Sequence, residues 1–150
     1  MIVWCTFSSR LDVLDGVIFF SFTFWILEGA DIQEFSVSHD DRANGTMVFL
    51  RGQVAQDLDT RESLHTGDAG AQTAKTMENI AMLLAEAGSE MSHICRIVVY
   101  LTDIRYREAV YQEMGRWLQG VHPCSTGIIV SALARPEWVV EIEVTAVIPD

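Results

Sequence analysis

The stretch QTAKTMENIAMLLAEAGSEMSHICRIVVYLTDI, residues 72–104, joins a helical pattern to a strand pattern and decides the fold. In its first half, apolar side chains recur every three or four residues, which predicts a helix beginning near Ala71 with one buried stripe. Asp68 precedes it as a capping residue, and Gly88 stands where a glycine commonly ends a helix. The stripe consists of Ala74, Met77, Ile80, Ala81 and Leu84.

The second half is a nearly continuous apolar run, residues 94–101, rich in β-branched side chains. Such a run is typical of a strand that is covered on both faces. Thr102 or Asp103 then caps a second helix, which Gly120 ends. Its buried stripe is expected to contain Tyr106, Val110, Met114 and Trp117.

The flanking residues complete the order of elements. Asn44-Gly45 is a strong turn signal between a weak strand at 35–41 and a second strand at 46–54, so this pair predicts a hairpin. A polar loop at 56–70 leads into the first helix, and two strands, 126–133 and 138–148, close the chain. The order β-β-α-β-α-β-β predicts an α+β sandwich in which two helices cover one face of a single mixed sheet.

The last strand contains VVEIEVTAV, residues 139–147, whose two faces differ. Because side chains alternate along a strand, one face is wholly apolar and packs on the helices. Glu141 and Glu143 lie on the opposite face, interleaved with apolar residues. A sheet face that is half apolar and half carboxylate predicts burial against another subunit.

Composition limits the classes of partner. With 150 residues, the chain is long enough for one domain with a substantial core, and its formal net charge is −11. That charge repels nucleic acid, whose phosphates are bound mainly by lysine and arginine. The chain has three cysteines, a small and odd number that does not make a disulfide framework. This count predicts a reducing, cytoplasmic location.

Residues 1–32 form an apolar N-terminal extension ahead of a domain predicted at 33–150. Its most apolar part, VIFFSFTFWIL at 17–27, is shorter than the roughly 20 residues that span a bilayer. A single preceding cation, Arg10, and the lack of a small-residue cleavage site also argue against a signal peptide. We expect an extra helix or strand that covers a hydrophobic surface, or a tail translated from an upstream start, and no membrane partner.

Three segments carry a resemblance to a known family. They are GTMVFLRGQV (45–54), the opening stretch 72–104, and HPCSTGIIVSALARPEWVVEIEVTAVI (122–148). In these three motifs the chain resembles the RidA/YjgF family, also called the enamine/imine deaminase or endoribonuclease L-PSP family. The resemblance implies a chorismate-mutase-like fold and a homotrimer with a β-barrel-like core, with ligand sites in the clefts between subunits. It also implies hydrolysis of enamines and imines to 2-keto acids, without a cofactor or metal.

The resemblance assigns candidate site residues, with two departures in the word that follows Pro123. The family has an arginine two residues after this proline, to bind the substrate carboxylate, and a cysteine two residues later. Ser125 and Gly127 occupy those positions here. Cys124 and Thr126 accompany them at the expected cleft.

The remaining candidates come from three other places in the chain. The family's water-positioning glutamate corresponds to Glu141. In the family's Ser-Gly-Gln word, Arg51 replaces the serine before Gly52. Phe35 is the candidate for an aromatic residue that covers the site.

Loss of a charge-assisted fork to a carboxylate costs on the order of 1.5–3 kcal/mol. The sequence therefore predicts a homotrimer that binds a small metabolite between subunits, with standard 2-imino acid deamination impaired. The alternative is a hydrolytic deaminase in which Arg51 replaces the missing cation and Glu141 positions water. Arg51 can equally form a structural ion pair with Glu141 or Glu143. A ribonuclease is the third possibility, and the net charge opposes it.

Two His-x-Cys words, His93 to Cys95 and His122 to Cys124, raise the alternative of a zinc site, since residues i and i+2 share a strand face. The resemblance places them at different strand ends and implies no metal. We therefore interpret the two histidines and Cys95 as structural residues, whereas Cys124 borders the expected cleft.

Overall fold

The computed structural model describes residues 9–14, 17–22 and 44–150. The chain divides into two compact units, Met1–Gln33 and Glu34–Asp150. In the first unit, strand β1 (Ser9–Leu14) pairs antiparallel with β2 (Val17–Phe22), so part of the apolar stretch at 17–27 is a strand. No helix within the described residues has the length and apolar character needed to cross a membrane.

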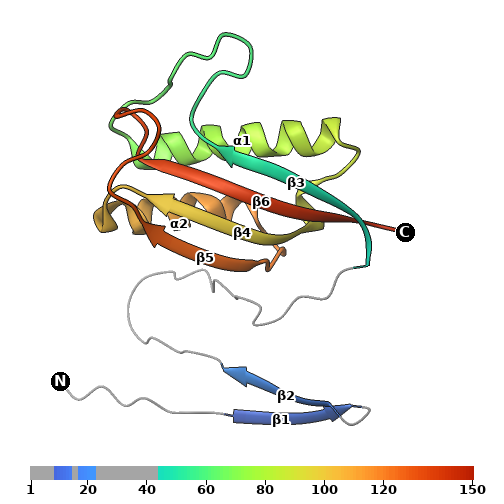
Figure 1. The fold of residues 1–150 in the computed structure, drawn as a ribbon. Coiled ribbons are helices and arrows are strands. Elements are labelled where there is room, and N and C mark those ends of the chain that lie inside the picture. Colours follow the sequence, from blue (N-terminus) through green and yellow to red (C-terminus); the bar gives the residue numbers. More distant parts are fainter. Residues whose placement is uncertain (1–8, 15–16, 23–43) are drawn as a thin grey trace, which may run out of the picture. The chain divides into compact units, whose positions relative to one another are not determined.

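The second unit contains a four-stranded sheet in the order β3-β6-β4-β5 (Figure 1). Its strands are β3 (Gly45–Gln53), β4 (Ile94–Leu101), β5 (Cys124–Ile129) and β6 (Val140–Pro149). Strands β4 and β5 run parallel, whereas β6 is antiparallel to both β3 and β4. The predicted mixed sheet is confirmed. The additional strand expected at 35–41, with Phe35, lies outside the described residues.

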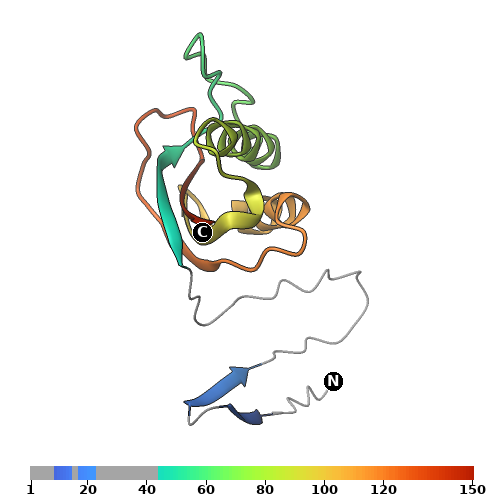
Figure 2. The same cartoon turned by 90° about the vertical axis from the view of Figure 1, so that its right-hand side faces the viewer.

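Helices α1 (Ala69–Glu86) and α2 (Arg107–Trp117) both cover the same face of this sheet (Figure 2). The core forms between them and the sheet, as the apolar stripes predict. It includes the fully buried side chains of Met77, Ile80, Leu84, Ile97, Val99, Val110, Met114, Val140 and Ile142. The α+β class with two helices on one face is therefore confirmed.

The ends of the helices follow the capping signals in part. The Asp68 carboxylate accepts a hydrogen bond from the Ala71 amide at 2.9 Å, and Gly88 has a φ of 73° after the end of α1. The second helix differs from expectation because Asp103 caps a short 3₁₀ turn, η2 (Ile104–Tyr106), before α2 begins. A 3₁₀ turn at the start of an α-helix is common.

The last two strands have different bounds from those predicted. Strand β5 ends at Ile129 rather than 133, because its partner β4 ends at Leu101, the residue paired with Ile129. Strand β6 begins at Val140 rather than 138, because the Trp138 amide donates to the Arg135 carbonyl at 3.2 Å and so belongs to the preceding turn. The end of the partner strand sets the first limit and turn geometry sets the second, and the apolar pattern encodes neither.

We predict that Asp68→Ala lowers the free energy of unfolding by about 1 kcal/mol, because the first turn of α1 loses its only side-chain cap. Chemical denaturation at one fixed protein concentration measures the change. Asp68→Asn is the matched control, since asparagine also accepts from the amide, and it should remain close to wild type. Equal losses in both variants would contradict a capping role.

Candidate functional site

A bulge in β3 brings Gly52 against Glu141 on β6. Leu50 pairs with Val144 and Gln53 with Ile142, so Arg51 and Gly52 together oppose one residue of β6, Glu143, and it is the side chain of Glu141 that reaches Gly52. A β-carbon added at Gly52 would collide with the carboxylate of Glu141. The glycine is therefore what allows this carboxylate to lie flat on the neighbouring strand, and bulges often redirect side chains in this way.

The surroundings of Glu141 favour its protonated form. Burial raises the pKa of this carboxyl above its ordinary value, the negative charge of Glu143 adds to the rise, and Arg51 partly opposes it. Glu143 itself accepts a hydrogen bond from the Tyr100 hydroxyl at 2.9 Å, which is the main cause of the raised pKa of that tyrosine. Two carboxylates on one face thus have different roles: Glu143 is bonded to Tyr100, and Glu141 is available to a ligand.

Arg51 lies close enough to affect Glu141 electrostatically without a direct bond. Within residues 44–150, neither Glu141 nor Glu143 forms an ion pair with Arg51 within 4.0 Å. Its side chain is exposed. The structural ion pair considered from sequence is therefore not formed, and the guanidinium is accessible to a ligand beside Glu141.

The predicted site residues of β5 divide between the two faces of the sheet. Ser125 and Gly127 pair with Ile97 and Val99, whose side chains are in the core, so they share the helix-covered face. Thr126 pairs with Val98 and lies on the opposite face, which is also the face of Glu141. The hydroxyl pair at 125–126 therefore does not act as a unit.

Cys124, at the start of β5, pairs with Arg96 of β4. This cation next to the cysteine is a neighbour that sequence spacing does not indicate, because the two residues are far apart in the chain.

The sheet face opposite the helices carries exposed apolar side chains together with Glu141. We call it the helix-free face; it comprises Met47, Phe49, Arg96, Val98, Tyr100, Thr126, Ile128, Glu141, Glu143, Thr145 and Val147. In the single chain Phe49 is 71% exposed and Met47 is 56% exposed. Adjacent exposed apolar side chains on a sheet are typical of an interaction surface. The exposed apolar side chains on this face agree with the alternation of apolar residues and glutamates along the last strand.

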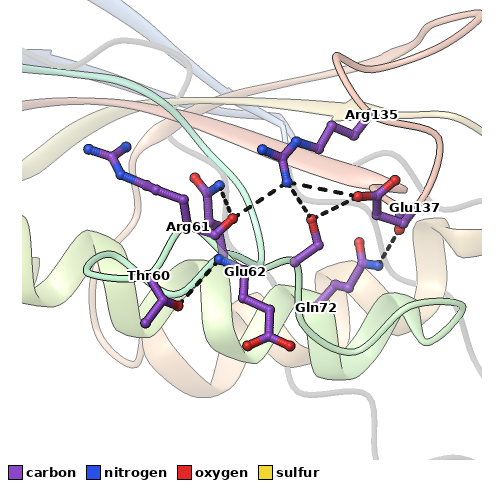
Figure 3. Close-up of polar contacts among 8 residues, drawn as sticks. Thr60, Arg61, Glu62, Gln72, Arg135 and Glu137 are labelled. Atoms are coloured by element: carbon purple, nitrogen blue, oxygen red, sulfur yellow. Dashed lines mark hydrogen bonds and ion pairs between the residues drawn. The ribbon is translucent and has the colours of Figure 1, made fainter.

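Two buried amides on α1 fix the loops that lead to this face, and sequence analysis missed both. Gln72 is fully buried, and its Nε2 donates to the Glu137 carbonyl at 2.7 Å (Figure 3). Its Oε1 accepts from the Val139 amide at 3.0 Å. These bonds hold the backbone four and two residues before Glu141. Asn79 donates in the same way to the carbonyls of Val54 and Gln56, just after Gln53.

Charged and polar side chains connect the same two loops at their outer side (Figure 3). The Ser63 hydroxyl donates to the Glu137 carboxylate at 2.9 Å, and the Arg135 guanidinium donates to the Ser63 hydroxyl at 3.2 Å. The pKa of Glu137 is lowered, mainly by its own backbone amide and then by Ser63. The loops beside Gly52 and Glu141 are thus held together, and the signal in the sequence is only a few polar residues in turn-rich segments.

We predict that Glu141→Gln gains stability relative to wild type as pH rises. A carboxyl whose folded pKa is raised stabilises the fold below its unfolded pKa, and that contribution is lost as pH increases through the folded value. The difference between variant and wild type should grow from pH 4.5 towards neutrality in denaturation curves. Glu86→Gln, on the exposed end of α1, is the control for the effect of the substitution itself. A flat difference for Glu141→Gln would contradict the raised pKa.

Comparison with known proteins agrees with this arrangement. The family described as Endoribonuclease L-PSP matches residues 32–148. Protein DfrA of Myxococcus xanthus is 39% identical over 103 residues, which is 69% of this chain and 77% of that protein. A RutC family protein of Haemophilus influenzae is 29% identical over 81% of this chain and 94% of its own length.

Solved structures show the same fold. The Rid family protein YyfB of Yersinia pestis superposes with a TM-score of 0.70 at 27% identity, over 83% of this chain and 98% of that one. A YjgF family protein of Neisseria meningitidis is 35% identical over 73% of this chain and 84% of that one, with a TM-score of 0.59. From the family match across most of the second unit, this chain belongs to the Endoribonuclease L-PSP family, the RidA/YjgF family.

Proposed function

We propose that this protein is a homotrimer that binds a small metabolite in clefts between its subunits. The observation that carries the proposal is the position of Glu141: a half-buried carboxyl with a raised pKa, on a sheet face with strongly exposed apolar side chains. Association of copies through that face would bury Met47 and Phe49 and place Glu141 at the edge of a shared cavity. A carboxyl in such a place can accept or donate a hydrogen bond to a polar ligand.

The division of β5 between two faces supports a site shared by two copies. Glu141 lies on the helix-free face, whereas Ser125 and Gly127 lie on the helix-covered face of the edge strand. One copy cannot bring both sets to a single small ligand. Two copies can, if the edge strand of one approaches the helix-free face of the next. Thr126 and Cys124 would then line the contact from the helix-free face of β5.

A hydrolytic enamine/imine deaminase is the second candidate, and the accessible Arg51 guanidinium near Glu141 favours it. In this reaction water adds to the imine carbon, the carbon–nitrogen bond breaks, and ammonia leaves with a 2-keto acid as the other product. Glu141 would take a proton from the water and return it to the nitrogen that leaves as ammonia, and a raised pKa moves it towards the range in which a carboxyl group is effective in both steps. Arg51 would hold the substrate carboxylate. The net charge of −11 gives no support to a nucleic-acid substrate.

We predict that the protein elutes and scatters light as a particle of three times its 16.8 kDa chain mass. Phe49→Asp should shift it to the mass of a single chain, because a charge would be buried in the contact between copies. Ile104→Asp is the matched control: Ile104 is also an exposed large apolar residue but lies in the turn before α2. A monomeric wild type would remove the shared cleft.

The deaminase reaction separates the two candidates. We expect 2-iminobutanoate, generated in the assay and followed as the semicarbazone of its keto acid, to hydrolyse little faster with the protein than in buffer. Acceleration that falls at least tenfold in both Glu141→Gln and Arg51→Ala would instead identify the enzyme. Glu86→Gln is the control for nonspecific effects.

A further inference from the structure

We propose that Arg107 of α2 binds the carboxylate of a small organic acid at the edge strand β5, in place of the arginine that position 125 lacks. The inference rests on the proposed function and names the ligand class, a small monocarboxylate. It assigns the cation to a helix residue that no motif of the sequence indicates. It also differs from the alternative in which Arg51 replaces the missing cation, because Arg51 lies on the other face of the sheet from Ser125 and Gly127.

The first support is the position of the guanidinium. A β-carbon built on Gly127 would lie 3.7 Å from a terminal nitrogen of Arg107 and would collide with the Tyr111 hydroxyl. The Arg107 guanidinium stacks on the Tyr111 ring, with its central carbon 4.4 Å from the ring centre. A cation on α2 therefore lies beside the β5 face that Ser125 and Gly127 share.

The second support is complementarity of size between the helix and the strand. Ser125 and Gly127 are small, and the Tyr111 and Arg107 side chains occupy the space above Gly127. The Ser125 hydroxyl is buried and has no hydrogen-bond partner among the described residues. It therefore does not take over the role that an arginine at position 125 would have. The small residues on β5 and the long ones on α2 form one consistent set.

The third support is that the other arginines around α2 and in the turn before β6 have carboxylate partners, whereas Arg107 has none among the described residues. Arg105 and Arg116, in the same segment, form ion pairs with Asp103 and Glu113, and Arg135 contacts Glu137. Within residues 44–150, no carboxylate lies within 4.0 Å of Arg107, and its side chain is exposed. Stacking on an aromatic ring leaves the edge N–H groups of a guanidinium pointing outward, which suits bidentate binding of a carboxylate.

The edge position of β5 supplies further donors. Within the described residues no strand pairs with its outer side, so part of its backbone N–H groups are unpaired there. Gly127 is exposed and has no side chain to screen them. A carboxylate held by Arg107 would lie within this strip of donors.

The test compares an acid with its neutral analogue. Calorimetric titration of the full chain with 2-oxobutanoate and with 2-oxobutanamide gives the preference for the charged ligand as a ratio of Kd values. We expect a preference of about tenfold to a hundredfold in the wild type, from charge-assisted bonds to the carboxylate. Arg107→Gln should abolish this ratio, and Gly127→Ala should reduce it by displacing Tyr111. A merely structural effect would weaken both ligands alike and leave the ratio unchanged.

Arg116→Gln is the matched control, because Arg116 is on the same helix and already paired, and it should keep the wild-type ratio. An unchanged ratio in Arg107→Gln, or its loss in Arg51→Gln alone, overturns the inference. If the trimer binds the amide as tightly as the acid, the inference fails while the proposed function stands. If the wild type is a trimer that binds neither ligand, or is a monomer, the inference fails together with the site from which it was drawn.

Discussion

The hydrogen bonds of Gln72 and Asn79 to loop backbone are the constraint on which the candidate site depends. Both amides are fully buried on α1; one holds the chain just before β6, and the other holds the chain just after β3. A buried amide donor is costly without an acceptor, so the bonds from Gln72 Nε2 and Asn79 Nδ2 tolerate few alternative loop positions. The register that places Gly52 under Glu141 thereby becomes a consequence of helix packing.

The second constraint is that both helices cover the same face of the sheet. That arrangement leaves the helix-free face with exposed Phe49 and Met47 beside a carboxyl that resists ionisation. Apolar surface of this kind is stabilised when it is removed from water. The same asymmetry separates Glu141 from Ser125 and Gly127, and for this reason the proposed site is shared between two copies.

Two arginines are candidates to replace the cation that is missing at position 125. Arg51 lies by Glu141 on the helix-free face, and Arg107 lies by Gly127 on the other. A cation near the carboxylate suits proton transfer, whereas a cation away from it suits binding of an anion without neutralising the acid. The two proposed functions therefore differ in which of these arginines binds the ligand.

Periodicity and capping signals by themselves determined the α+β class, both helices, the buried strand β4 and the alternation of β6. These depend on local patterns of apolar residues, which a single segment contains. The limits of β5, the division of residues 125–127 between faces, and the approach of Arg107 to Gly127 were decided only by tertiary structure. They depend on register between distant segments, which is set by packing and by buried amides whose partners no local pattern reveals.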